Sequence, residues 1–356
     1  MRLLGISTFM IVLALGLTSC LNILQNEKAN SDGLFKDPNS TDWRDKPKID
    51  ISHDTFRPSM TLFSDTLIYQ NPNSVDPELR DVNTYSLSQE RIRHLAYRNQ
   101  RLSQNTYGTP LLQVGGLVAE VSEDAYYRAK QLFDQLNVPE APLVRFLGLG
   151  PEDNYSLYCE NFLNLGSLCA TQRGGVHGAI RFFELDILLH YIIYQIQVST
   201  DPGTGALTIE SSRLDKLKND LRIYRQWIGA GKFSIIMTSR IDLLSGELES
   251  SSRTEIREIL QNYPEIELLV YSPGEARAPE CVNIRTFNGK PLYKVGIPSL
   301  SFARSQSSNA FTGYTELFTG QEQLMIQHRS LTGTGNGLRD QLDSAHRIFI
   351  DQPCQP

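Results

Sequence analysis

The sequence predicts an α/β fold, and three features of the chain agree on it. Short apolar runs of strand length alternate with amphipathic stretches of helical period over most of the chain. Beyond residue 282 the apolar runs are short and separated by Gly, Asn and Ser, which is typical of antiparallel strands. Roughly 300 residues follow a polar N-terminal region, enough for one large domain with a substantial core.

The N-terminus has the features of an export signal. Arg2 supplies a positive charge, and the apolar run Leu3–Leu17 is shorter than the ~20 residues that span a bilayer. The sequence Leu17-Thr18-Ser19-Cys20 resembles the lipobox of bacterial lipoproteins. That resemblance implies a signal peptide over residues 1–19 and fatty acyl chains, such as palmitate, on Cys20. The alternative is an ordinary secretory signal with a chance cysteine at its end.

Residues 20–55 are polar and without period, so we expect a flexible tether between the lipidated cysteine and a domain at 56–356. The membrane is then a partner through the lipid, at the bacterial cell envelope. Leu21 is not the aspartate that retains some lipoproteins in the inner membrane, which favours the outer membrane. The formal net charge of −6 argues against a nucleic-acid partner. The sequence does not identify the protein or small molecule that binds.

Four cysteines remain if Cys20 is lipidated. They are Cys159, Cys169, Cys281 and Cys354. An even number in an exported protein permits two disulfides with three connectivities, of which Cys159–Cys169 closes the shortest loop. Four free thiols are the alternative.

Apolar patterns place the elements in order along the chain. Strands are predicted at Met60–Phe63, Pro110–Val114, Leu143–Leu147, Ala179–Leu185, Phe233–Met237, Ile266–Tyr271, Val282–Thr286, Leu292–Ile297, Tyr314–Phe318 and Leu324–Ile326. Helices are predicted over Leu87–Leu102, after Ser122, over Leu214–Ile228 and from Ser252 to Pro264. Ser86 with Gln89 and Ser252 with Glu255 have capping-box spacing, and Ser122 precedes an acidic first turn.

Several of the predicted strands are followed by short motifs whose order along the chain is informative. They read Ser64-Asp65-Thr66-Leu67, Val114-Gly115-Gly116-Leu117-Val118, Gly150-Pro151-Glu152-Asp153, Thr238-Ser239-Arg240 and Ser272-Pro273-Gly274-Glu275. Their order and spacing, between about residues 58 and 330, resemble the calcineurin-like metallophosphoesterase superfamily. That resemblance implies a four-layer α/β/β/α sandwich, metallo-dependent phosphatase-like, with two metals at the carboxyl ends of strands.

Nearly every metal ligand implied by the resemblance is replaced. Where the family has a coordinating side chain, this chain has Leu67, Gly116, Pro151, Glu152, Ser239, Pro273 and Glu275. Asp65 alone keeps a ligand role. Without two cations around an activated water, the hydrolytic chemistry of the family is lost. We therefore expect no catalytic residue, no cofactor, and a pseudo-enzyme with a binding or structural role.

Two alternatives stay open. Asp65, Glu152, Asp153 and Glu275, with Arg240 nearby, could converge on a single Ca²⁺ or Mg²⁺, since hard cations prefer oxygen ligands. The chain would then be a hydrolase with a remodelled carboxylate site. The interpretation that we prefer is that these residues are ordinary surface acids partly paired with Arg240, since charged residues are mostly exposed. The second alternative is a lipoprotein binding domain of another α/β fold.

Overall fold

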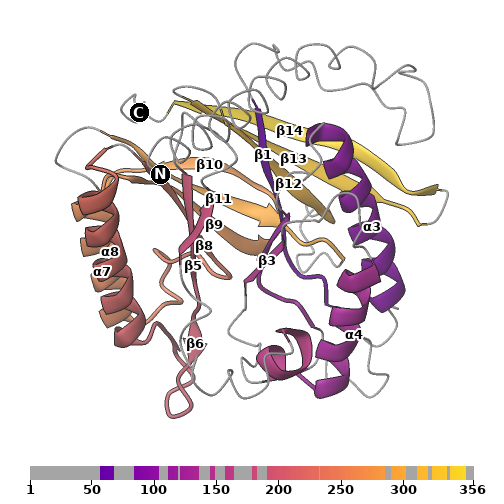
Figure 1. Cartoon of the computed structure of the whole chain (residues 1–356), viewed down its shortest axis with the longest axis horizontal. Helices are drawn as coiled ribbons and strands as arrows, with labels where there is room; N and C mark the ends of the chain where they lie inside the picture. The colour runs from indigo at the N-terminus through magenta and orange to yellow at the C-terminus, as the bar shows by residue number, and fades with distance from the viewer. Residues whose placement is uncertain are drawn as a thin grey trace, which may run out of the picture.

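Two six-stranded β-sheets pack face to face, and helices cover the outer face of each, giving four layers (Figure 1). This computed structural model describes residues 57–67, 84–103, 111–118, 121–135, 145–148, 157–163, 179–182, 191–231, 233–284, 290–301, 311–319, 323–334 and 337–349. The predicted signal peptide and tether lie outside the described residues.

The first sheet has the order β14-β13-β12-β1-β2-β3. Its strands are β1 (Arg57–Phe63), β2 (Leu111–Val114), β3 (Arg145–Gly148), β12 (Gly313–Thr319), β13 (Gln323–Thr332) and β14 (Arg339–Phe349). β1, β2 and β3 run parallel, and β12 joins β1 antiparallel to begin a meander with β13 and β14. The carboxyl ends of β1 and β2 therefore lie side by side.

The second sheet has the order β10-β11-β9-β8-β5-β4. Its strands are β4 (Ala179–Phe182), β5 (Tyr191–Ile196), β8 (Ser234–Ser239), β9 (Ile266–Gly274), β10 (Arg277–Val282) and β11 (Leu292–Pro298). β5, β8, β9 and β11 are parallel, and β4 and β10 form antiparallel edges. A separate hairpin joins β6 (Ser199–Thr200) to β7 (Leu207–Thr208).

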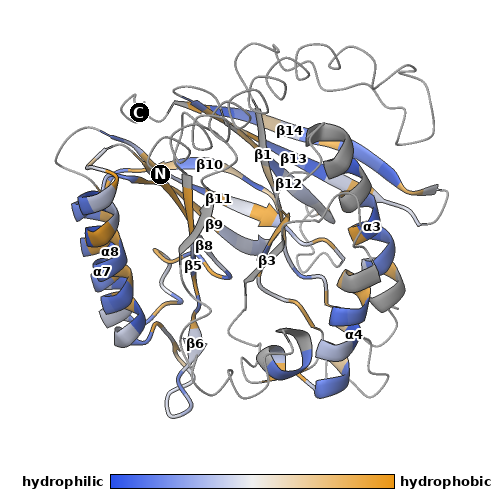
Figure 2. Cartoon of the chain, viewed as in Figure 1, coloured by the Kyte–Doolittle hydropathy of each residue, from blue (hydrophilic) through white to orange (hydrophobic). Residues whose placement is uncertain are grey.

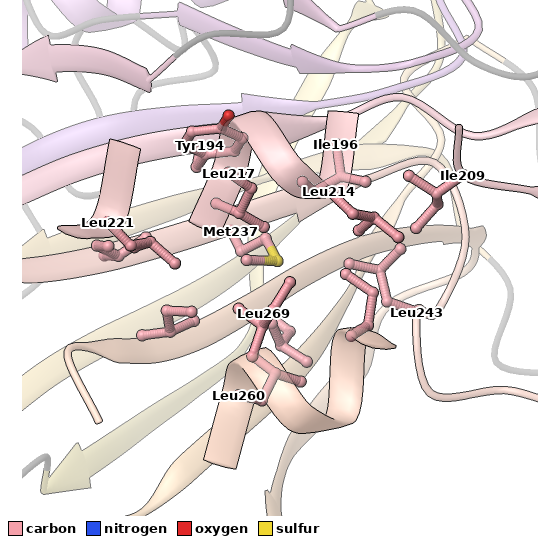
Figure 3. Close-up of a cluster of buried hydrophobic side chains, with 14 of the residues drawn as sticks. Tyr194, Ile196, Ile209, Leu214, Leu217, Leu221, Met237, Leu243, Leu260 and Leu269 are labelled. Carbon is pink, nitrogen blue, oxygen red and sulfur yellow. The ribbon is translucent and has the colours of Figure 1, made fainter. Parts of the chain in front are cut away.

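Helices α7 (Ser211–Trp227) and α8 (Ser250–Asn262) cover the second sheet with the faces that their periodicity predicts. Leu214, Leu217, Leu221 and Tyr224 of α7 are all buried. They pack with Met237 and other strand residues in the cluster of Figure 3. The outward sides of both helices are mainly hydrophilic (Figure 2). Burial of one apolar stripe thus fixes the position of these helices.

Helices α3 (Thr84–Ser103) and α4 (Glu123–Gln135) cover the first sheet, and a short π-helix, η2 (Tyr158–Leu163), packs beside α4. Between the sheets, apolar residues of both interdigitate, among them Leu62, Leu112, Ile236 and Val270. β8 and β9 are therefore buried on both faces, as their unbroken apolar runs predict.

A buried charge network holds α3 on the first sheet. Nη2 of Arg98 donates to Oε2 of Glu316 at 3.1 Å, and Nε of Arg329 donates to Oδ1 of Asp340 at 2.7 Å. The other oxygen of Asp340 lies 2.6 Å from Nε2 of His94. Burial alone would raise the pKa of Asp340, but Arg98, Arg329 and His94 outweigh burial and hold it well below its ordinary value. Removing one of the arginines or carboxylates would leave an uncompensated buried charge, at a cost of ~3–5 kcal/mol.

Two of the predicted helix caps are wrong. α3 begins at Thr84, so Ser86 lies inside the helix instead of capping it. α8 begins at Ser250, and the hydroxyl of Ser252 bonds to the backbone of Ile209 in the neighbouring loop. The hydroxyl of Ser252 therefore bonds to a residue that is distant in the sequence and does not cap its own helix. The third cap is confirmed, because Oγ of Ser122 accepts a hydrogen bond from N of Ala125 at 3.2 Å.

Several strands differ from their predicted form. β11 is antiparallel to β10, as predicted, but parallel to β9 on its other side. The strand predicted at Val282–Thr286 lies earlier, at Arg277–Val282. The sequence pattern predicts no strand at β5 or at the largely polar β14. β14 is an edge strand whose residues are mostly exposed, so it lacks the apolar signal of a buried strand.

Cys281 is disulfide-bonded, whereas Cys169 and Cys354 lie outside the described residues. Among the helices in the described part of the chain, none combines the length and the hydrophobicity needed to cross a membrane.

The environment of His328, on β13, leads us to expect that acid weakens the packing between the two sheets. It lies 2.8 Å from Oγ1 of Thr315 and 3.2 Å from the carbonyl oxygen of Arg277 in the other sheet. Burial lowers its pKa from 6.5 to about 4. The unfolded chain therefore binds a proton that the folded chain does not as pH falls from 6.5 to about 4. We expect this residue alone to remove about 3 kcal/mol of unfolding free energy across that window.

Denaturant titrations at several pH values measure this loss. The His328→Gln variant should have a flatter pH dependence between 6.5 and 4, and the half-buried His346→Gln variant a smaller change. An unchanged slope in His328→Gln would contradict the prediction.

Candidate functional site

The two sheets meet where β1 and β11 end. Ser64 and Ser299 form an isolated parallel bridge between the sheets. N of Leu300 donates to the carbonyl of Ser64 at 2.8 Å, and N of Ser301 donates to the carbonyl of Asp65 at 3.3 Å. The first motif segment is therefore part of the junction between the sheets.

The backbone turns sharply after β1. Asp65 and Leu67 have positive φ, 48° and 44°, which costs an L-residue roughly 1–2 kcal/mol. Two hydrogen bonds hold this conformation, from N of Asp65 to the carbonyl of Gly115 (3.1 Å) and from N of Leu67 to the carbonyl of Gly116 (3.2 Å). The first and second motif segments thus fix each other's geometry.

Asp65 is fully buried, and both of its carboxylate oxygens are engaged. Nη2 of Arg240 lies 3.0 Å from Oδ1 in an ion pair. Oγ of Ser299 donates to Oδ2 at 2.6 Å. A buried carboxylate needs a compensating charge and hydrogen bonds, and these two side chains supply them.

Arg240 reaches Asp65 from the end of β8. Only 7% of its side chain is exposed. Its aliphatic part crosses the backbone of Gly115, where a Cβ atom would lie 2.6 Å from Cδ of the arginine. Nη1 donates to the carbonyl of Ser272, at the end of β9. One side chain therefore contacts the ends of β1, β2 and β9 while extending from β8.

Gly116 is the position to which the motif resemblance assigns a bridging aspartate, and the structure gives a steric reason for glycine there. Its φ is +67°, and a Cβ atom would lie 2.3 Å from Oδ1 of Asp65. Real Cβ atoms do not approach that closely, so either Asp65 or the added side chain would have to move. The site leaves no room for a second carboxylate at this position.

Hydroxyl groups fill much of the remaining junction. Oγ of Ser272 donates to Oγ of Ser64 at 2.5 Å, which links the ends of β9 and β1. Nε2 of Gln113 donates to Oγ1 of Thr66 at 3.0 Å. Oγ of Ser88, on α3, lies 2.7 Å from Oγ of Ser301. Sequence reasoning missed the roles of these residues, because serine and glutamine carry no positional signal until the elements are assembled.

α3 also brings a second cation to the junction. Nη1 of Arg91 donates to the carbonyl of Leu300. Burial lowers the pKa of Arg91 to about 10, with Glu90 opposing the shift, so the guanidinium stays protonated at neutral pH. Arg91 and Ser88 thus join α3 to the segment that follows β11.

The other predicted site residues are placed separately or lie outside the described chain. Oγ of Ser239, buried at the end of β8, has no hydrogen-bond partner among the described residues. Glu275 pairs with Arg277 at 2.7 Å in the turn after β9. Pro273 lies in β9, and a Cβ atom on Gly296 would come within 2.9 Å of its ring. The predictions for Cys20, Pro151, Glu152 and Asp153 fall outside the described residues.

The described donors do not fit a two-metal centre. Within the described ranges, no three His, Cys, Asp or Glu side chains are grouped so that they could hold a metal ion. Asp65 directs its oxygens at Arg240 and Ser299, and Leu67 offers no coordinating atom. The convergence of Asp65 with Glu152 and Asp153 involves residues outside the described part.

Comparison with solved structures identifies the fold. The chain superposes on a dimetal phosphatase from Danio rerio with a TM-score of 0.55 at 8% identity, covering 82% of this chain and 99% of the other. It superposes on PhoD with a TM-score of 0.50 at 10% identity, covering 84% of this chain and 70% of the other. No family model and no curated protein sequence matches the chain. The fold is that of the calcineurin-like metallophosphoesterases, as the motif frames predict, and another α/β fold is excluded.

The contact between Gly116 and Asp65 yields a matched pair of variants. Gly116→Ala combines a positive φ with a clash against Asp65, whereas Gly205, at φ +69°, has no atom near its added Cβ. We expect Gly205→Ala to lower the unfolding free energy by about 1–2 kcal/mol through backbone strain alone. Gly116→Ala should cost roughly 2–5 kcal/mol, because overpacking adds to that strain.

Chemical denaturation of both variants measures the difference. Equal losses would show that Asp65 does not fill the space beside Gly116.

Proposed function

We propose that this protein, which has the fold of the calcineurin-like metallophosphoesterases, is a lipid-anchored protein of the bacterial cell envelope with a non-catalytic binding or structural role. The buried pair of Asp65 and Arg240 carries the non-catalytic part of the proposal. A two-metal hydrolase holds cations ~3.5–4 Å apart with bridging and terminal ligands and activates a water between them. Here the one remaining ligand carboxylate is neutralised by a protein side chain.

The space around the pair supports the same proposal. A bridging carboxylate at position 116 would collide with Asp65, and the stem of Arg240 occupies the space over Gly115. The described end of β8 offers a serine and an arginine in place of histidine. The segments at the strand ends are then bonded to one another and not to metals, which supports a role other than hydrolysis.

The second candidate is a metal-dependent phosphoesterase with a remodelled site. It is favoured by the similarity to a structure described as a dimetal phosphatase, which raises a divalent cation as a cofactor. Asp65 and Glu275, together with Glu152 and Asp153, would supply carboxylates for a single cation.

An assay of the full chain, purified in detergent, distinguishes the two candidates. We expect no turnover of p-nitrophenyl phosphate or bis-p-nitrophenyl phosphate above the buffer rate with Mn²⁺, Zn²⁺ or Ca²⁺. Turnover that is retained in Arg222→Gln, a surface variant, but lost in Glu275→Gln and Asp65→Asn would favour the remodelled hydrolase and refute the non-catalytic role.

The proposed anchor is tested by acylation. Cells fed an alkyne analogue of palmitate should label the wild-type chain and not the Cys20→Ala variant, because the thiol is the acceptor. Ser19→Ala, which keeps a small residue before the cysteine, should retain the label. Labelling that persists in Cys20→Ala would place the lipid elsewhere or make the attachment nonspecific.

A further inference from the structure

Arg240, which follows β8, forms a buried ion pair, unlike the ion pairs that charged side chains ordinarily form at a protein surface. Arg240 is 7% exposed and Asp65 is fully buried, so both charges are removed from water. Burial of an ion costs several kcal/mol unless a partner and hydrogen bonds compensate it. The pair lies where the ends of β1, β2, β8 and β9 meet, and it includes Asp65, to which the resemblance to metallophosphoesterases assigns a metal-ligand role.

The guanidinium of Arg240 contacts oxygen atoms from more than one strand end, as a metal ion would through its ligands. It contacts the side chain of Asp65 after β1 and the carbonyl of Ser272 at the end of β9. Its stem packs on Gly115 after β2. The group thus carries one positive charge to a point where segments from both sheets converge, and it satisfies oxygens from two of them.

The neighbouring residues are adapted to the arginine. Gly115 and Gly116 both have positive φ and both lack the Cβ that would strike Arg240 or Asp65. Ser299 binds the carboxylate oxygen opposite the one paired with Arg240, so the carboxylate is held from both sides. The charges balance within the pair, one positive and one negative.

We propose that Arg240 is a permanent internal cation that replaces the metals of this fold in joining the two sheets. The junction at Asp65 and Ser64 then closes without any bound metal, and the guanidinium excludes a divalent cation from Asp65. Arginine suits this role because its pKa is too high for it to lose its charge and its planar head forms several directed hydrogen bonds. This proposal extends the metal-independent function above, and its test measures stability instead of turnover, so the two can fail separately.

The first test removes the cation and supplies it again in solution. We expect Arg240→Ala in the full chain, purified in detergent, to unfold about 10 °C below wild type. Guanidinium chloride at 20 mM, far below denaturing concentrations, should restore part of this loss by entering the vacated space. Sodium chloride at the same concentration should not. The control is Arg277→Ala, an exposed arginine paired with Glu275, which should lose little and gain nothing from guanidinium.

A double-mutant cycle serves if Arg240→Ala does not fold. Arg240→Met leaves the buried charge of Asp65 without the guanidinium that balances it, whereas Arg240→Met with Asp65→Asn removes both charges. The double variant should therefore unfold at a higher temperature than Arg240→Met. Equal unfolding temperatures, with Asp65→Asn alone equal to wild type, would overturn the proposal.

Metal addition gives the complementary measurement on the wild-type chain. EDTA, Mn²⁺, Zn²⁺ or Ca²⁺ at 1 mM should shift the unfolding temperature by less than ~1 °C, because ligand binding stabilises only when the folded state takes up the ligand. A rise of several degrees with one of these ions that disappears in Asp65→Asn would show a metal at Asp65 and overturn the proposal.

Discussion

The buried contact between Asp65 and Arg240 is the constraint on which the geometry of the site depends. It requires Asp65 to leave β1 with positive φ and requires glycine at positions 115 and 116. It also brings the end of β8 to the end of β1, across the boundary between the sheets. Substitution at any of these positions would disturb the others, because they share one volume.

Hydrogen bonding extends this junction beyond the ion pair. The bridge of Ser64 with Ser299 connects the sheets through the backbone, and Ser272 adds a hydroxyl link. From α3, Ser88 and Arg91 bind the same region. The network of Arg98, Glu316 and Asp340 fixes α3 on the sheet. Two sets of contacts therefore position α3, the buried ion pairs with the first sheet and the hydrogen bonds to the junction between the sheets.

The proposed replacement of metals by a guanidinium has chemical consequences. A metal ion exchanges ligands and lowers the pKa of a bound water toward neutrality, whereas a guanidinium donates hydrogen bonds in a fixed plane and has no coordination position for water. An arginine can preserve the electrostatic and structural contribution of a cation while the hydrolytic contribution is lost. A fold built around a metal site can in this way keep its architecture after its ligands change.

The sequence alone determined the class of fold and most of its elements, because hydrophobic period is a local property. The apolar faces of α4 and α7, the buried strands β8 and β9 and the cap at Ser122 all follow from spacing along the chain. The motif frames also predicted the phosphoesterase-like sandwich, whereas Arg240 entered only as a neighbour of the acids in two open alternatives. β14 was missed because an exposed edge strand has no apolar period.

Tertiary structure alone decided what the altered site became. Capping at Ser86 and Ser252 failed because those residues lie inside helices, where Ser252 binds the backbone of Ile209. The full burial of Asp65, the passage of Arg240 over Gly115 and the hydrogen bond from Ser299 join residues up to 234 positions apart. No local pattern encodes such contacts, since the free energy of a buried charge depends on what the rest of the chain places around it.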